Sequence, residues 1–133
     1  MITGWYKDST SNWYYFDNNG QMHHGWLFLE SNQYYMDLND GHMYTDTYEW
    51  IDKYLYIFNS DGSLYTGWYK EIYDDNTYDW LYFDADGKMH CGWLQLGNAW
   101  YYMHPYEGWM YYDTPLEIDG DQYLFLSLIH ISE

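Results

Sequence analysis

The sequence predicts an all-β fold, a β-solenoid of stacked β-hairpins that repeat about every 21 residues. Three observations predict it. A Gly-Trp pair recurs along the chain, an aromatic run follows each pair, and an Asx-rich turn ending in glycine follows each run. β-favouring runs separated by turn residues predict hairpins, and no span shows strong helical periodicity. We therefore expect one hairpin for each set of landmarks.

The Gly-Trp pairs set the repeat length. They begin at Gly4, Gly25, Gly67 and Gly92. The first two lie 21 residues apart, and the 42 residues from Gly25 to Gly67 equal two such units, with Asp46 in the expected glycine position. The predicted units span 4–24, 25–45, 46–66, 67–91 and 92–112, followed by a partial unit at 113–126.

The aromatic run supplies the second strand of each hairpin. Trp13-Tyr14-Tyr15-Phe16 is the first run, and its equivalents are residues 33–36, 55–58, 80–83 and 100–103. Side chains alternate between the faces of a strand, so positions two and four share one face and positions one and three share the other. The fourth position is always Phe or Met, which predicts that it faces the core. A lone hairpin is marginal in water, so we expect the hairpins to stack.

Composition excludes several functions. The chain has 133 residues, with 21 acidic side chains against 4 lysines and a formal net charge of −17. Such a polyanion should bind neither nucleic acid nor an anionic membrane surface. No apolar stretch is long enough to insert in a bilayer. Cys91 is the single cysteine, which excludes an intrachain disulfide framework.

The order of landmarks from Gly4-Trp5 through residues 13–17 and Met22 to Gly25-Trp26 resembles the cell-wall-binding, or choline-binding, repeat. The resemblance covers roughly residues 1–126. The unit is also similar to the glucan-binding repeats of streptococcal glucosyltransferases and to the repetitive domains of clostridial toxins. The resemblance implies a β-solenoid whose ligands bind between hairpins. In the choline-binding branch it implies cages of two consecutive Gly-Trp tryptophans, an aromatic from the strand between them, and a methionine.

Carried over to this sequence, the resemblance implies two complete cages. The first comprises Trp5, Tyr15, Trp26 and Met43, and the second comprises Trp68, Tyr82, Trp93 and Met110. The middle unit departs from the pattern, because residues 46–48 replace Gly-Trp and Ile57 replaces the ring, so we expect packing there. Independently of the resemblance, a quaternary ammonium donates no hydrogen bonds and is held by ring faces at ~0.5–2 kcal/mol per contact.

The leading hypothesis is a noncatalytic binding module that anchors a surface or secreted protein to choline-bearing cell-wall polymers such as teichoic acid. The expected location is outside the cell, as a secreted protein or at the cell surface or cell wall, in Gram-positive bacteria or their phages. Two alternatives stay open: binding of glucan or a host glycan by stacked rings, and a structural spacer. Strand edges left unpaired at the terminal units would allow a homodimer.

We expect no catalytic residues, cofactor or metal site. No nucleophile–base arrangement stands out from the repeat. The turn at Asp84-Ala85-Asp86-Gly87 could suggest calcium, but Gln95 occupies the loop position where an EF-hand needs an acid. The histidines lack the spacing of a zinc site.

Both ends of the chain carry a further expectation. Met1 occupies an internal repeat position, which predicts a slice of a longer array. Residues 127–133 abandon the pattern, and two interpretations stay open: a non-native tail, or a C-terminal capping strand of the kind that solenoids need.

Overall fold

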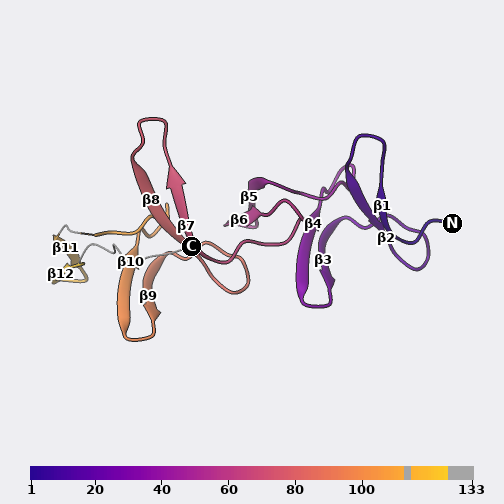
Figure 1. The fold of residues 1–133 in the computed structure, drawn as a ribbon. Helices are drawn as coiled ribbons and strands as arrows, with labels where there is room; N and C mark the ends of the chain where they lie inside the picture. The colour runs from indigo at the N-terminus through magenta and orange to yellow at the C-terminus, as the bar shows by residue number, and fades with distance from the viewer. Residues whose placement is uncertain (113–114, 126–133) are drawn as a thin grey trace. The chain divides into compact units, whose positions relative to one another are not determined.

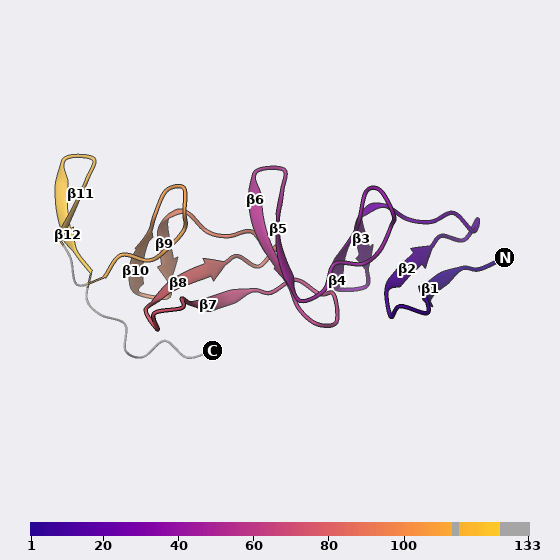
Figure 2. The same ribbon diagram turned by 90° about the horizontal axis from the view of Figure 1, so that it is seen from above.

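The structure, a computed structural model, describes residues 1–112 and 115–125, and every regular element in them is a β-strand. Each sheet consists of two antiparallel strands that follow one another in the chain, so the described residues form six hairpins (Figure 1 and Figure 2). The strands are β1 (Gly4–Lys7), β2 (Trp13–Phe16), β3 (Gly25–Leu29), β4 (Asn32–Met36), β5 (Thr47–Ile51), β6 (Tyr54–Phe58), β7 (Gly67–Ile72), β8 (Tyr78–Phe83), β9 (Gly92–Leu96), β10 (Ala99–Met103), β11 (Pro115–Ile118) and β12 (Asp121–Leu124). The all-β prediction is confirmed. None of the described residues forms a helix with the length and apolarity that crossing a membrane requires.

The chain divides into two compact units, each with three hairpins. Met1–Tyr65 contains β1 to β6, and the second unit, which begins at Thr66, contains β7 to β12. The expected tail at 127–133 lies outside the described residues, as do residues 113, 114 and 126 of the expected partial unit. The described part of that partial unit forms the hairpin β11–β12.

Register is the same in the first five hairpins. In each one, the tryptophan of Gly-Trp, or the residue that replaces it, pairs with the third residue of the aromatic run. The pairs are Trp5–Tyr15, Trp26–Tyr35, Tyr48–Ile57, Trp68–Tyr82 and Trp93–Tyr102. Directly opposed residues share one face of a hairpin, so each pair sets two side chains next to each other.

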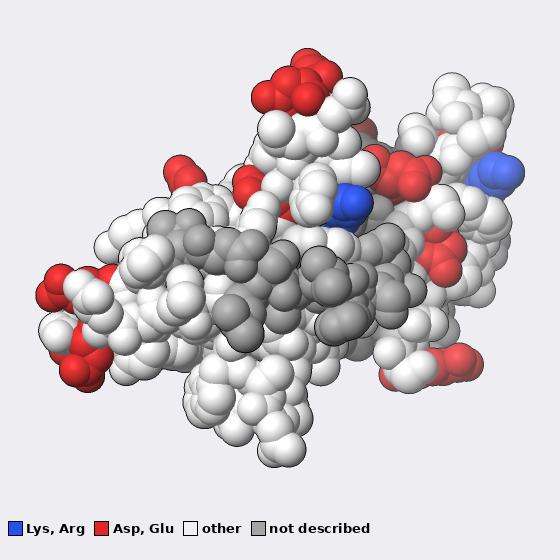
Figure 3. Space-filling view, turned by 60° about the vertical axis from the view of Figure 1, so that its left-hand side comes forward, with Lys and Arg blue, Asp and Glu red and all other residues white. Residues whose placement is uncertain are grey.

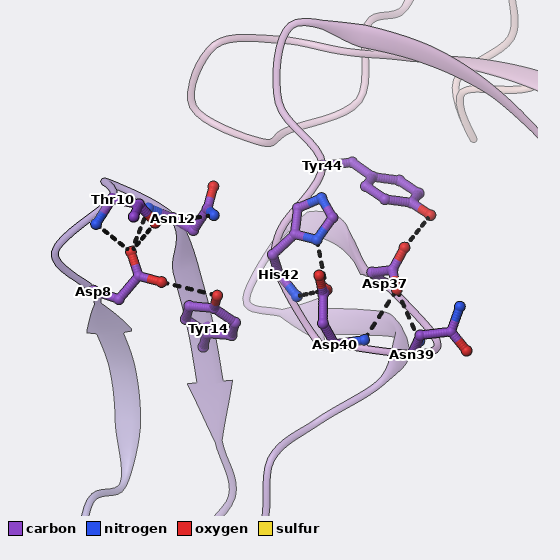
Figure 4. A network of polar contacts seen from close by, with 9 residues as sticks. All are labelled: Asp8, Thr10, Asn12, Tyr14, Asp37, Asn39, Asp40, His42 and Tyr44. Atoms are coloured by element: carbon purple, nitrogen blue, oxygen red, sulfur yellow. Dashed lines mark hydrogen bonds and ion pairs between the residues drawn. The ribbon is translucent and has the colours of Figure 1, made fainter.

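The residues in each hairpin loop determine its conformation. Four hairpins have two-residue loops, and Asp52 (φ 50°) with Lys53 (φ 78°) has the two positive φ angles that a type I′ turn requires. The hairpins β1–β2 and β7–β8 have longer loops, at residues 8–12 and 73–77. In the first of these, the Asp8 carboxylate accepts hydrogen bonds from the Thr10 hydroxyl at 2.7 Å and the Asn12 amide at 3.0 Å (Figure 4). These bonds, the Thr10 hydroxyl foremost, lower the pKa of Asp8 to about 2.

The fourth position of the aromatic run forms the core, as predicted. Its most buried members are Met36, Phe58, Phe83 and Met103, each no more than 1% exposed. In every one of the five runs this residue forms a β-bridge with the Met or Leu that follows the turn glycine, as in the Met36–Met43 pair. The bridge fixes the position of that methionine against its own hairpin.

The same methionines also contact the next hairpin. The Met43 side chain lies against Gly62, and Met89 lies against Gly108 in the same way. A Cβ at Gly62 would come 2.5 Å from the Met43 sulfur, and the φ angle there is +87°. Glycine is therefore required at this turn by its backbone conformation and by the approach of the methionine.

Candidate functional site

Five side chains from two hairpins meet around Trp5, and we call them the Trp5 cluster. The Trp5 ring makes edge-on contacts with Tyr15 at 5.1 Å and with Tyr34 at 5.2 Å between ring centroids. Trp13 lies perpendicular to it at 6.2 Å. Met43 completes the cluster and packs with Tyr15 and Tyr34. The rings come from β1, β2 and β4, so the cluster joins the first hairpin to the second.

A groove of about 360 Å³ opens beside this cluster. Its lining residues are Trp5, Trp13, Tyr34, Met43, Ser60 and Asp61. Asp61 brings a carboxylate to an otherwise aromatic surface. Its pKa is lowered by hydrogen bonds from the Ser63 hydroxyl and the Ser63 amide, so it stays ionised at neutral pH.

The second unit contains an equivalent arrangement, the Trp68 cluster. Trp68 contacts Tyr82 at 5.0 Å and Tyr101 at 5.1 Å, with Trp80 at 6.3 Å, all edge-on. Met110 packs into this group. Its five members are Trp68, Trp80, Tyr82, Tyr101 and Met110, and they occupy the same repeat positions as the Trp5 cluster. One arrangement of rings thus occurs in both units.

Backbone hydrogen bonds hold the methionine against the first tryptophan of the aromatic run. The Met43 amide donates to the Trp13 carbonyl at 2.8 Å, and the Met110 amide donates to the Trp80 carbonyl at 2.9 Å. Each bond reaches from one hairpin to the preceding one. The methionine that closes each cluster is therefore positioned by main-chain as well as side-chain contacts.

The structure groups the predicted residues differently from the expectation. Trp5, Tyr15 and Met43 meet, as do Trp68, Tyr82 and Met110, but Trp26 and Trp93 belong to other ring clusters. The reasoning from sequence missed four members of the two clusters: Trp13, Tyr34, Trp80 and Tyr101. Tyr34 and Tyr101 are second residues of their runs and contact the tryptophan of the preceding hairpin. Trp13 and Trp80 are first residues and contact the tryptophan of their own hairpin.

Trp26 lies in a ring cluster whose members pack closely against one another. Its ring contacts Tyr35 at 5.0 Å and Tyr56 at 4.9 Å, and Phe58 lies at 6.3 Å. Tyr35 and Tyr56 are both buried. Gln33 stands where the Trp5 cluster has Trp13, so this Trp26 cluster lacks one ring of the pattern. Trp26, which was expected in the first cage, thus packs against rings of its own and the following hairpin.

Trp93 forms a more open group, the Trp93 cluster. Its ring contacts Trp100 at 5.9 Å, Tyr102 at 5.1 Å and Tyr123 at 4.9 Å. A groove of about 620 Å³ is lined here by Trp93, Trp100, Tyr123, Leu124 and Phe125. The positions match the Trp5 cluster, but the residue equivalent to Met43 would lie beyond the described residues.

Two histidines fix the main chain of cluster tryptophans. His23 Nε2 donates to the Trp26 carbonyl at 2.6 Å, and His90 Nε2 donates to the Trp93 carbonyl at 2.6 Å. His90 Nδ1 also lies 2.9 Å from an Asp84 carboxylate oxygen. The sequence signal is a histidine directly after the repeat methionine, at Met22-His23 and at Met89-His90.

One group of residues has metal-ligating chemistry. Asp37, Asp40 and His42 each offer one possible ligand atom, and these three atoms lie within 4.8 Å of one another. Turn hydrogen bonds use these atoms: Asp37 accepts from the Asn39 and Asp40 amides and from the Tyr44 hydroxyl, and Asp40 accepts from His42 (Figure 4). The arrangement is explained as an Asx turn, and we assign no metal to it.

Comparison with protein families gives the class of these repeats. The choline-binding repeat model matches residues 1–48, and a putative cell wall binding repeat matches residues 92–103. Residues 1–48 and 92–103 are therefore similar to choline-binding and putative cell wall binding repeats, in agreement with the resemblance seen in the sequence.

Solved structures and a curated relative are similar over much of the chain. Choline binding protein F from Streptococcus pneumoniae is 31% identical with a TM-score of 0.72, and the match covers 94% of this chain and 39% of that one. The pneumococcal cell wall endolysin from phage Cp-1, in complex with choline, is 27% identical with a TM-score of 0.58, over 91% of this chain and 34% of that one. Glucosyltransferase-S of Streptococcus mutans is 35% identical over 98 residues, which are 72% of this chain and 6% of that protein. The chain thus spans well under half the length of each of these proteins.

Proposed function

We propose that this chain is a noncatalytic binding module that anchors a surface or secreted protein to choline-bearing polymers of the bacterial cell wall. The observation that carries the proposal is the repetition of one ring arrangement, two tryptophans, two tyrosines and a methionine, in the Trp5 and Trp68 clusters. The phage endolysin, solved in complex with choline, supports the ligand class.

The chemistry of the Trp5 cluster suits a quaternary ammonium. Trp5 and Trp13 are both more than a third exposed, so their rings are accessible beside the groove. Trimethylammonium groups are attracted to ring faces at ~0.5–2 kcal/mol per contact. The ionised Asp61 in the groove, and the net charge of −17, add attraction for a cation.

We propose further that the hairpins stack as a β-solenoid, with the units 4–24, 25–45, 46–66, 67–91, 92–112 and a partial unit after 112 as its repeats. Contacts between successive hairpins support this, among them the Trp5–Tyr34 ring pair in the compact unit Met1–Tyr65 and the Trp68–Tyr101 ring pair in the compact unit that begins at Thr66. Several weak sites on one array would give useful avidity for a repetitive polymer. Attachment at the cell wall or cell surface follows from that ligand.

Tryptophan fluorescence titrated with choline tests the proposal. We expect saturable binding in the millimolar range or tighter, and a Trp5→Ala variant that loses the signal of one site. Trp50→Ala is the matched control, because Trp50 is 59% exposed on β5 and lies outside both clusters. Absence of any choline response, or equal losses in the two variants, would refute the proposal.

Glucan binding is the competing function, favoured by the similarity to glucosyltransferase-S. Aromatic rings at about 5 Å spacing can also stack on sugar faces. Retention on a dextran column that is unaffected by choline and reduced in Trp5→Ala would favour this function over the first.

A further inference from the structure

Two lysines lie beside the two clusters at equivalent positions. Lys7 Nζ lies over the Trp13 ring at 5.8 Å from its centroid, and Lys70 Nζ lies over the Trp80 ring at 5.9 Å. Lys70 Nζ is closer still to the Tyr78 ring, at 4.3 Å. Lys7 is the cross-strand partner of Trp13, and Lys70 is the partner of Trp80. Each ammonium group is therefore held next to a tryptophan that forms a wall of its cluster.

The same position carries no lysine in the other hairpins of the repeat. Phe28 faces Gln33, Trp50 faces Leu55, and Gln95 faces Trp100. The Trp93 cluster thus has the tryptophan without the lysine. Lysine occurs at this position only where the cluster is closed by a described methionine.

Neither lysine is neutralised by an acid in the described part of the chain. The ion pairs there involve His42, Lys88 and His90, and among the described residues no carboxylate oxygen forms an ion pair with Lys7 or Lys70. This is notable in a chain with 21 acidic residues and four lysines. Figure 3 shows acidic groups in several places on one face and basic groups in only a few. Neither ammonium group has a carboxylate partner among the described residues, so each can still pair with an external anion.

We propose that Lys7 and Lys70 make the two clusters selective for a choline phosphoester over free choline, by pairing with the phosphate while the rings hold the trimethylammonium group. The inference rests on the proposed function, because it requires that the rings bind a quaternary ammonium. In a choline phosphoester a short ethylene linker separates the two charges, so an anion lies close to any bound ammonium group.

Charge explains why a local lysine matters here. A phosphate is repelled by a protein of net charge −17, and it approaches most favourably where an unpaired ammonium group offsets that field. In the Trp5 groove, Asp61 attracts the ammonium end of the ligand, and Lys7, over the ring of the groove residue Trp13, attracts its phosphate end. The zwitterion is therefore matched at both ends.

The test compares two ligands on the intact chain. Choline and glycerophosphocholine are titrated by tryptophan fluorescence at equal, low ionic strength, with wild type and with a Lys7→Gln, Lys70→Gln double variant. Glutamine is the natural residue at the equivalent position 95. Lys88→Gln is the control, because it removes the same charge from the turn after β8, where Lys88 pairs with Asp86 at 3.7 Å.

The expected result is a loss of selectivity. The ratio of glycerophosphocholine affinity to choline affinity falls by up to about fivefold in the double variant, the size of one exposed charge pair, and stays at the wild-type value in the control. Added salt should reduce the wild-type ratio toward that of the variant. An unchanged ratio in the double variant overturns the inference while choline binding still upholds the proposed function. A rise in both affinities also overturns it, since the lysines would then be competing cations. Failure of wild type to bind either ligand overturns the proposed function itself.

Choline phosphoesters occur on wall polymers and on lipid headgroups, and a second arm distinguishes the sources. Pull-down with choline-bearing wall polymer is compared with co-sedimentation on phosphatidylcholine vesicles, each with wild type and the double variant. Lysine-dependent retention on the polymer supports the wall, and lysine-dependent co-sedimentation supports the lipid. Binding that is independent of the lysines in both arms overturns the inference.

Discussion

A Gly62→Ala substitution should weaken both the fold of the first unit and its ligand site. At φ +87° an L-residue costs about 1–2 kcal/mol relative to glycine. The new Cβ would also lie 2.5 Å from the Met43 sulfur and 2.7 Å from its terminal methyl carbon, so the methionine has to move. Because Met43 closes the Trp5 cluster, choline affinity at that cluster should fall together with the free energy of unfolding.

The matched control is Gly92→Ala, which has a similar φ of +83° and open space around the added Cβ. Urea unfolding followed by tryptophan fluorescence should show the backbone cost in both variants, about 1–2 kcal/mol each. Choline titration should show reduced binding at the Trp5 cluster in Gly62→Ala alone. If both variants bind choline like wild type, the Met43–Gly62 contact does not hold the site, and the reasoning is refuted.

Three further predictions concern a core methionine and two acids. Met110→Ala should cost about 2–5 kcal/mol in urea unfolding, because the side chain is only 2% exposed, and should weaken choline binding at the Trp68 cluster; a loss well below 1 kcal/mol would contradict this. Choline affinity at the Trp5 cluster should be constant from pH 7 to about pH 4.5, since the pKa of Asp61 lies below its ordinary value of 3.8; a titration nearer neutral pH would count against it. Asp8 has a folded-state pKa of about 2, so its contribution to stability is present above about pH 4 and is lost as pH falls toward 2. Thermal unfolding of wild type and Asp8→Asn should therefore differ at pH 7 and converge near pH 2.

The local fold was predictable because each hairpin depends on short-range signals. Gly-Trp, the aromatic run and the Asx-Gly turn recur within one unit, and the strands begin and end close to them, as β2 does at Trp13–Phe16. The core position was predictable for the same reason, since alternation and an invariant Phe or Met identify one face. The sequence indicated the hairpin β11–β12 only as the start of a further repeat. Its Gly-Trp signal is missing, because Pro115, which pairs with Leu124, occupies the position of the tryptophan in other hairpins.

The composition of the ring clusters was only partly predictable. Alternation shows that Tyr34 and Trp13 point to opposite faces of their strands, but not which hairpin approaches each face. The Trp5–Tyr34 contact depends on packing between hairpins, which no spacing within one unit encodes. The same applies to Trp80, which is only 8% exposed although its position in the run was predicted to face outward.

The middle hairpin shows why the sequence repeat is not the functional unit. Tyr48 and Ile57 replace the ring pair there, so β5–β6 builds no cluster of the Trp5 kind. The turn after β6 nevertheless supplies Ser60 and Asp61 to the groove of the Trp5 cluster, and Gly62 to the methionine that closes it. The groove of the Trp5 cluster therefore draws on three consecutive hairpins, of which the third has no ring pair of the Trp5–Tyr15 kind. A hairpin without the ring pair can thus still contribute to a cluster, because its turn lies at a groove formed two hairpins earlier in the chain.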